Sequence, residues 1–227
     1  MPTLALDGAG LTVGDRVVLA PTTLTLTERR IGVIGANGSG KSTLVRMLNG
    51  LVEPSAGRVV VDGFDVARQG AKVRRLVAFA FTDPAAQLVM PTCVEDVELS
   101  LRSLERHAGA RRARAMDVLE RFGLADHAHD SVHSLSGGQK QLLALAGVLA
   151  VEPAVLVADE PTTLLDLANT RQVADLLFRL EQQLVLVTHD LDLARRCERV
   201  LVVEDARIRY DGDPGAAVDD YVASVGA

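Results

Sequence analysis

The segment GANGSGKS, residues 35–42, has the residue types and spacing to bind a chain of phosphate groups, and we call it the phosphate loop. It matches G-x-x-x-x-G-K-[ST], whose glycines let the backbone curl so that several N–H groups point at the ligand. The Lys41 ammonium could reach the outer phosphates, and the Ser42 hydroxyl could ligate Mg²⁺. The candidate nucleotide-binding residues are Gly35, Ala36, Asn37, Gly38, Ser39, Gly40, Lys41, Ser42 and Thr43.

Two apolar runs further along the chain end in side chains that could complete such a site. AVLVADE ends in Asp159 and Glu160, and LVLVTHD carries His189. Asp159 could hold Mg²⁺, while Glu160 could polarise an attacking water. His189 could donate a hydrogen bond to charge that develops on the γ-phosphate. Each feature alone has an ordinary alternative, since acidic pairs often cap helices and single histidines are often structural.

The elements around these residues indicate a parallel α/β sheet. RIGVIG, residues 30–35, is predicted to be a buried strand, and KSTLVRMLNG a helix that ends at Gly50. The two apolar runs are typical of parallel strands covered on both faces, with a helix over 167–182 between them. Alternating strands and helices predict this sheet type.

Other segments predict smaller structures beside the sheet. Residues 3–29 alternate in polarity, which predicts antiparallel strands with turns near Gly14 and Pro21, and GRVVVDG predicts another strand. Residues 102–122 are rich in Arg and Ala and predict helices of a separate small lobe. Its inward-facing side chains are expected to be Leu104, Met116, Val118 and Leu119.

Composition narrows the class of protein. The 227 residues fit one compact domain, and the net charge of -6 argues against a broad electrostatic grip on nucleic acid or an anionic membrane. The N-terminus shows no secretory signal, and the longest apolar stretch is shorter than the roughly 20 residues that span a bilayer. Cys93 and Cys197 are expected to be reduced thiols.

The segment LSGGQ identifies a family. Ser136, Gly137 and Gly138 precede an apolar helix and would offer bare N–H groups and a hydroxyl to an anion. With the phosphate loop, the Asp-Glu strand and His189 in the same order, the chain resembles the ATP-binding cassette (ABC) ATPases along essentially its whole length. We call residues 135–139 the signature segment: Leu135, Ser136, Gly137, Gly138 and Gln139.

The resemblance implies a P-loop NTPase of the α/β class, with a RecA-like core, an N-terminal antiparallel β subdomain and a small α-helical subdomain. It implies one domain over 1–227, with the core and β subdomain at 1–85 and 150–227 and the helical subdomain at 86–149. It also implies ATP hydrolysis with Mg²⁺, in which Ser42 and Asp159 hold the metal and Glu160 and His189 are catalytic.

In this family the signature segment serves the nucleotide of a facing subunit, so a second ABC ATPase subunit is expected, as a homodimer or a heterodimer. TTLLD, residues 162–166, resembles the loop that crosses the dimer interface. Asp166 keeps its place in that loop, although Leu164 and Leu165 stand where small residues are usual.

Two positions depart from the family pattern. Thr82 stands where a glutamine usually reaches Mg²⁺, so a water bridge, or replacement by Asp83 or Gln87, would be needed. Val13 stands where an aromatic ring usually stacks on adenine, which predicts weaker or less base-selective binding.

The residues after Thr82 resemble a transporter subclass. DPAAQLVMPTCVEDVELSL is similar to a segment of the ATPases of energy-coupling-factor (ECF) vitamin and metal-ion importers, most of all those of biotin modules. In these proteins the residue at Gln87 begins a short helix. The resemblance implies a transmembrane coupling (T) protein and a substrate-binding membrane (S) protein as partners, no nucleic acid, and a peripheral location on the cytoplasmic face of the inner membrane.

Other functions fit less well. The chain could be the ATPase of another ABC transporter class. Soluble ABC ATPases of DNA repair typically carry long coiled coils or zinc-binding cysteines, and translation-associated ABC proteins have tandem cassettes; neither pattern is present here. The signature segment argues against a small-molecule kinase.

Overall fold

The computed structural model describes residues 1–225, so 226–227 of the predicted domain lie outside the described residues. The chain divides into two compact units. The first unit comprises Met1–Phe79, Ala154–Glu160 and the chain from Phe178 onward, and the second comprises Ala80–Pro153 and Pro161–Leu177. The subdomain boundaries expected from the sequence stay a prediction.

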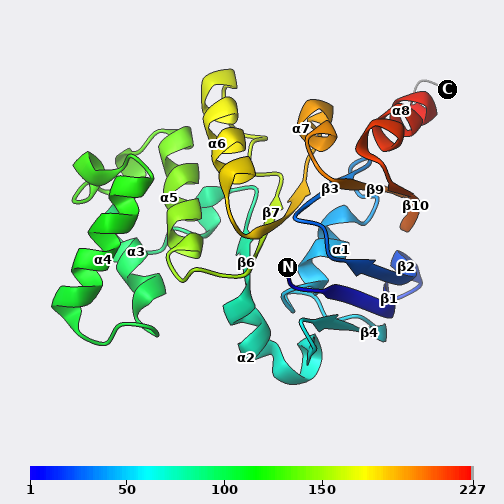
Figure 1. The fold of residues 1–227 in the computed structure, drawn as a ribbon, viewed down its shortest axis with the longest axis horizontal. Helices are drawn as coiled ribbons and strands as arrows, with labels where there is room; N and C mark the ends of the chain where they lie inside the picture. Colours follow the sequence, from blue (N-terminus) through cyan, green and yellow to red (C-terminus); the bar gives the residue numbers. More distant parts are fainter. Residues whose placement is uncertain (226–227) are drawn as a thin grey trace. The chain divides into compact units, whose positions relative to one another are not determined.

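Two sheets build the first unit (Figure 1). The four-stranded sheet, in the order β2-β1-β4-β5, is antiparallel, with strands β1 (Leu4–Val13), β2 (Arg16–Leu26), β4 (Ala56–Val61) and β5 (Phe64–Asp65). The six-stranded sheet has the order β10-β9-β3-β8-β7-β6 and consists of β3 (Arg30–Ile34), β6 (Val77–Ala80), β7 (Val155–Asp159), β8 (Gln183–Val187), β9 (Arg199–Glu204) and β10 (Arg207–Gly212). Strands β3, β7, β8 and β9 are parallel, which the apolar runs predicted for β7 and β8.

The turn predicted at Gly14 is present, but the one predicted at Pro21 is wrong. Pro21 lies inside β2, in an irregular stretch where the register with β1 shifts between Leu19 and Thr22. Because β2 is an edge strand, a residue without an N–H donor costs the sheet no ladder hydrogen bond on its open side. The proline therefore reads as a turn in the sequence but forms a bulge in the structure.

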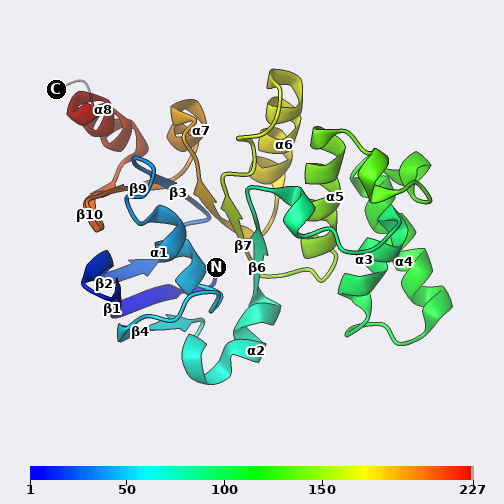
Figure 2. The ribbon, with the colours of Figure 1, turned by 180° about the vertical axis from the view of Figure 1, so that it is seen from behind.

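Helices cover both faces of the six-stranded sheet. Helix α1 (Lys41–Met47) contacts β7 and β8 on one face, and α7 (Leu191–Arg195) and α8 (Pro214–Val225) contact β3, β9 and β10 on the other (Figures 1 and 2). Helix α2 (Val66–Leu76) leads into β6. The predicted first helix is confirmed, although it ends at Met47 rather than at Gly50.

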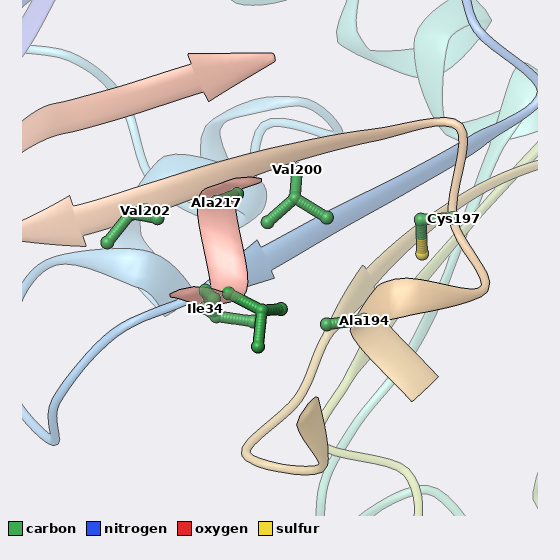
Figure 3. Close-up of a cluster of buried hydrophobic side chains, with 7 residues drawn as sticks. Ile34, Ala194, Cys197, Val200, Val202 and Ala217 are labelled. Atoms are coloured by element: carbon green, nitrogen blue, oxygen red, sulfur yellow. The ribbon is translucent and has the colours of Figure 1, made fainter. Parts of the chain in front are cut away.

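Buried aliphatic side chains hold α7 and α8 to the sheet. Ile34, Val200 and Val202 project from the strands toward Ala194 of α7 and Ala217 of α8, with Cys197 at the edge of the cluster (Figure 3). Small residues on the helices let them approach the branched side chains of the strands closely. Both Cys197 and Cys93 are buried free thiols, as the sequence predicted.

The second unit is mostly helical. Its main helices are α3 (Cys93–Leu101), α4 (Ala108–Arg121), α5 (Gly137–Leu149) and most of α6 (Leu167–Arg179), with short 3₁₀ turns η1 (Pro84–Ala86), η2 (Ala125–His127) and η3 (Val132–Ser134). Helices α3, α4 and α5 pack on one another. Val118 and Leu119 are buried as predicted, and Met116 is half-buried. The inward assignment of Leu104 is wrong: it follows the end of α3 and is 53% exposed.

Candidate functional site

The phosphate loop connects β3 to α1, as the sequence predicted. Gly35 has φ 145°, and a Cβ there would lie 2.1 Å from the carbonyl oxygen of Val203 on β9, so only glycine fits. Gly40 precedes α1 with φ 110° and places no side-chain cap on the helix. The first N–H groups of α1 therefore have no intrahelical acceptor and no side-chain cap, which is the arrangement that binds anions at a helix start.

The Lys41 side chain is folded into the loop. Its Nζ donates hydrogen bonds to the carbonyl oxygens of Gly35 at 2.8 Å and Ala36 at 2.9 Å. Burial lowers the pKa of Lys41, while the negative charges of Glu160 and Asp159 act in the opposite direction. The loop thus holds a cation among its own carbonyls and near two carboxylates.

Ser42 and Asp159 meet directly. The Ser42 hydroxyl donates to Oδ1 of Asp159 at 3.0 Å, and Arg46 forms an ion pair with Oδ2 at 3.0 Å. Asp159 is only 1% exposed, so these contacts offset the cost of burying its charge. A hydroxyl and a carboxylate in contact are hard oxygen donors, and Mg²⁺ commonly binds to one or two such groups together with nucleotide phosphates. The pair fits Mg²⁺.

Glu160 and His189 also meet. The Nε2 atom of His189 lies 2.8 Å from Oε1 of Glu160, although the two residues follow different strands, β7 and β8. The backbone N–H of Glu160 donates to the carbonyl of Val187 at 3.0 Å, and Glu160 has φ 53°, which is uncommon for a residue with a side chain. Such local strain is frequent where a side chain must be aimed. The structure thus brings together the two predicted catalytic side chains.

The signature segment forms the start of α5 in the second unit. Ser136 and Gln139 form a reciprocal capping box: the Ser136 N–H donates to Gln139 Oε1 at 2.9 Å, and the Gln139 N–H donates to Ser136 Oγ at 3.3 Å. Leu135 is buried beside them. Because the box satisfies these two donors, the N–H groups of Gly137 and Gly138 remain the donors of this helix start without an acceptor in the helix.

Asn169 is a neighbour of the signature segment that sequence reasoning missed. A Cβ at Gly138 would lie 2.2 Å from its side-chain oxygen. Asp166, the predicted interface aspartate, accepts from the Asn169 backbone N–H at 2.9 Å and from its Nδ2 at 2.8 Å. The available signal was the spacing of Asp166 and Asn169, which is that of a helix cap and its third residue.

The segment after β6 uses its side chains to shape its own turn. The Gln87 Oε1 accepts from the backbone N–H of Phe81 at 2.7 Å, and Asp83 caps η1 by accepting from Ala85 N–H at 2.9 Å. The expectation that Gln87 begins a short helix is wrong, because it follows η1 as its C-terminal cap residue. The Gln87 carboxamide instead contacts the backbone at the start of the turn, at Phe81. Thr82 lies between Phe81 and the capping residue Asp83.

Val13 lies at the end of β1, where it is 61% exposed and pairs with Arg16 across the hairpin. Within residues 1–225, no helix is long and apolar enough to cross a bilayer.

The family model described as "ABC transporter" matches residues 21–163. A biotin transport ATP-binding protein, BioM of Rhizobium etli, is 41% identical over 215 residues, which cover 95% of this chain and 96% of that protein. The energy-coupling factor transporter ATP-binding protein EcfA1 of Symbiobacterium thermophilum is 40% identical over 217 residues, covering 93% of this chain and 71% of that protein.

Among solved structures, cbiO1 from Clostridium perfringens, described as part of the ABC transporter complex cbiONQ, superposes with a TM-score of 0.83 at 30% sequence identity. The superposition covers 98% of this chain and 93% of that one. The predicted fold class is confirmed by this likeness and by the two sheets of the first unit.

Proposed function

Because this chain belongs to the ABC transporter family, as an ATP-binding subunit that hydrolyses ATP, we propose that it powers an ECF-type importer whose cargo is biotin. The observation that carries the catalytic part is the pairing of Ser42 with Asp159 and of Glu160 with His189, beside Lys41. These residues come from three segments far apart in the sequence.

Each residue of this set has a role that its chemistry supports. The loop N–H groups and the Lys41 ammonium bind the phosphates, and Ser42 and Asp159 would hold Mg²⁺, which would neutralise charge on the phosphates. Glu160 accepts a hydrogen bond from the attacking water and orients it, and His189 donates toward the γ-phosphate. The Glu160–His189 contact at 2.8 Å holds the two side chains next to each other.

The signature segment acts on the nucleotide of a second ABC ATPase subunit. The signature segment offers hydrogen-bond donors but no cation: the N–H groups of Gly137 and Gly138 and the Ser136 hydroxyl. These donors are suited to contact a triphosphate that another subunit already binds. Hydrogen bonds to charged groups are worth about 1.5–3 kcal/mol each. ATP therefore closes the dimer, and hydrolysis removes the γ-phosphate and opens it. Asp166 lies at the same interface.

Replacing Glu160 by glutamine tests the catalytic role. The amide keeps the shape of the carboxylate but cannot accept a proton from water, so Glu160→Gln should abolish hydrolysis and trap an ATP-bound dimer. Hydrolysis is measured as phosphate release, and dimerisation by light scattering after size exclusion. The exposed Glu181→Gln is the matched control and should behave as the wild type. Near-normal turnover in Glu160→Gln would contradict the proposal.

The transport class is supported by residues 83–101 and by the printed names of the relatives. Identity along the whole chain does not by itself assign the cargo, because a relative of similar identity is named for methionine import. We propose that the ATPase dimer docks on a T protein that also holds an S protein, at the cytoplasmic face of the inner membrane.

Affinity capture from detergent-solubilised membranes tests these partners. The tagged chain should bring down an integral coupling protein and a small integral substrate-binding protein, and radiolabelled biotin should bind to the captured complex. Capture of the permease pair of another importer would assign the chain to another ABC transporter class. ATPase activity stimulated by DNA or RNA, without membrane partners, would contradict a transport function.

A further inference from the structure

A hydrogen-bond relay leads from Asp130 to the signature segment through His127. The Nδ1 atom of His127 lies 2.7 Å from Oδ2 of Asp130, and its Nε2 atom lies 2.9 Å from Nε2 of Gln139. Gln139 is the residue whose side chain closes the capping box with Ser136. His127 ends the η2 turn, and all of these residues lie in the second unit.

The position of the proton on the His127 ring follows from the contact between Ser136 and Gln139. A backbone N–H can only donate, so the Gln139 atom that faces the Ser136 N–H must be the oxygen. The amide nitrogen of Gln139 then faces His127, and because it can only donate, His127 Nε2 must accept. The ring proton therefore lies on Nδ1, where the Asp130 carboxylate accepts it. Each of the three contacts in the relay then joins a donor to an acceptor.

We infer that His127 is a positioning residue for the signature segment, acting through Gln139. Its Nε2 lone pair holds one end of the Gln139 carboxamide while the Ser136 N–H holds the other. With both ends held, the carboxamide cannot rotate away from Ser136. The capping box then keeps the Ser136 hydroxyl and the N–H groups of Gly137 and Gly138 in the orientation that receives a γ-phosphate.

This inference rests on the proposed function, in which the signature segment binds the nucleotide of a facing subunit. It goes further by assigning a task to a residue outside the segment. Asp130 has a supporting part, because its carboxylate selects the tautomer in which Nε2 is free to accept.

Two substitutions separate the two ends of the ring. In His127→Gln the side-chain oxygen stands near the position of Nε2 and can still accept from Gln139. In His127→Asn the polar atoms stand near Nδ1 and reach only toward Asp130. His127→Ala removes both contacts, and His133→Ala, which truncates an exposed histidine of the η3 turn, is the matched control.

ATP-driven dimerisation is measured in the Glu160→Gln background, where hydrolysis does not interfere. His127→Ala and His127→Asn should weaken the dimer about tenfold, since one hydrogen bond is lost at each of two sites. His127→Gln should restore it to within about twofold, and His133→Ala should leave it unchanged. ATP binding to the separate subunit should be the same in all four, which distinguishes positioning from loss of the fold.

Nitrogen-15 NMR of the imidazole rings gives a second readout that needs no nucleotide. In the full chain, the His127 signal, assigned by its loss in His127→Gln, should show the neutral tautomer with the proton on Nδ1. The opposite tautomer would overturn the inference. So would a parent that dimerises with ATP while His127→Ala dimerises equally well. A parent that fails to dimerise at all would instead overturn the proposed dimer mechanism, and the inference with it.

Discussion

The phosphate loop and the signature segment both end at the first turn of a helix, yet the two turns are built differently. Gly40 precedes α1 with no side-chain cap, whereas Ser136 precedes α5 as half of a capping box. The phosphate loop also holds the Lys41 ammonium, while the capping contacts of the signature segment involve neutral groups only. The first turn therefore carries a positive charge of its own for a triphosphate, and we propose that the second adds to a triphosphate that is already bound.

The largest effect should come from removing the charge that distinguishes the phosphate loop. Lys41→Ala loses charge-assisted hydrogen bonds to two phosphates, and at about 1.5–3 kcal/mol each this should weaken ATP binding roughly 100-fold to 20,000-fold. Calorimetric titration with ATP measures it, with the exposed Lys72→Ala on α2 as the control. ATP affinity close to that of the wild type would mean that the loop N–H groups suffice, and the comparison between the two turns would fail.

A methyl group at Gly138 should damage the signature segment without touching the phosphate loop. Gly138→Ala forces its Cβ against the Asn169 carboxamide, whose Nδ2 donates a hydrogen bond to Asp166 while the Asn169 backbone N–H donates a second one. We expect ATP-driven dimerisation to weaken about 10-fold to 100-fold, with ATP binding to the single subunit unchanged. Asn169→Ala, added to Gly138→Ala, makes room and should recover part of the loss. A double variant no better than the single one would contradict the steric explanation.

An aromatic ring at residue 13 should strengthen ATP binding by the first unit. Val13 is exposed at the end of β1, and a ring there could stack on adenine, which is worth about 1–3 kcal/mol by analogy with base–aromatic platforms. Val13→Phe should therefore raise ATP affinity about fivefold to 100-fold and increase the preference over GTP. Val17→Phe, on the same hairpin and also exposed, is the control. Tight, strictly adenine-specific binding by the unaltered chain would show that another group already fills this role.

Each unit contains one buried thiol, so the pH dependence of stability can be compared between the two units. Burial raises the pKa of Cys197 to about 12, and burial together with the charge of Asp130 raises the pKa of Cys93. The folded state keeps the Cys197 proton at pH values where the unfolded chain loses it. Stability is therefore fully present below about pH 9 and falls as pH rises toward 12, by about 1.4 kcal/mol per pH unit.

Urea unfolding at pH 8 and pH 10 measures this loss. Cys197→Ala should reduce the difference between the two pH values by about 1.4 kcal/mol. Cys93→Ala provides the corresponding measurement in the other unit and should reduce it less. An equal pH dependence in wild type and Cys197→Ala would show that this thiol opens to solvent before the first unit unfolds.

The elements of the first unit could be predicted because their signals are local. Apolar runs such as residues 155–159 mark buried strands, and the phosphate loop carries its glycines within eight residues. The gathering of Asp159, Glu160 and His189 at adjacent strand ends also follows once the strands are parallel. Pro21 misled because a proline signals a turn in general but is also tolerated on an edge strand, and edge position is a property of the whole sheet.

The second unit was less predictable because its important contacts join residues far apart in the sequence. Nothing in the sequence pairs Asn169 with Gly138, or His127 with Gln139. Leu104 failed for a related reason: helical periodicity assigns a face only where the helix continues, and α3 ends at Leu101. The five residues of the signature segment could be recognised in the sequence, whereas their contacts with Asn169 and His127 could not.

Replacing Thr82 by glutamine has the smallest expected effect. The longer side chain carries an oxygen further from the backbone, so Thr82→Gln should raise ATPase activity up to about threefold or leave it unchanged. Gln87 is a poor substitute for the glutamine that the family usually has at the position of Thr82. Its carboxamide oxygen already accepts a hydrogen bond from the Phe81 N–H, which shapes the turn at the start of the second unit. Thr82→Ser, which keeps the oxygen at the same reach, is the control and should match the wild type. A large loss of ATPase activity in Thr82→Gln would show that the threonine has a task of its own.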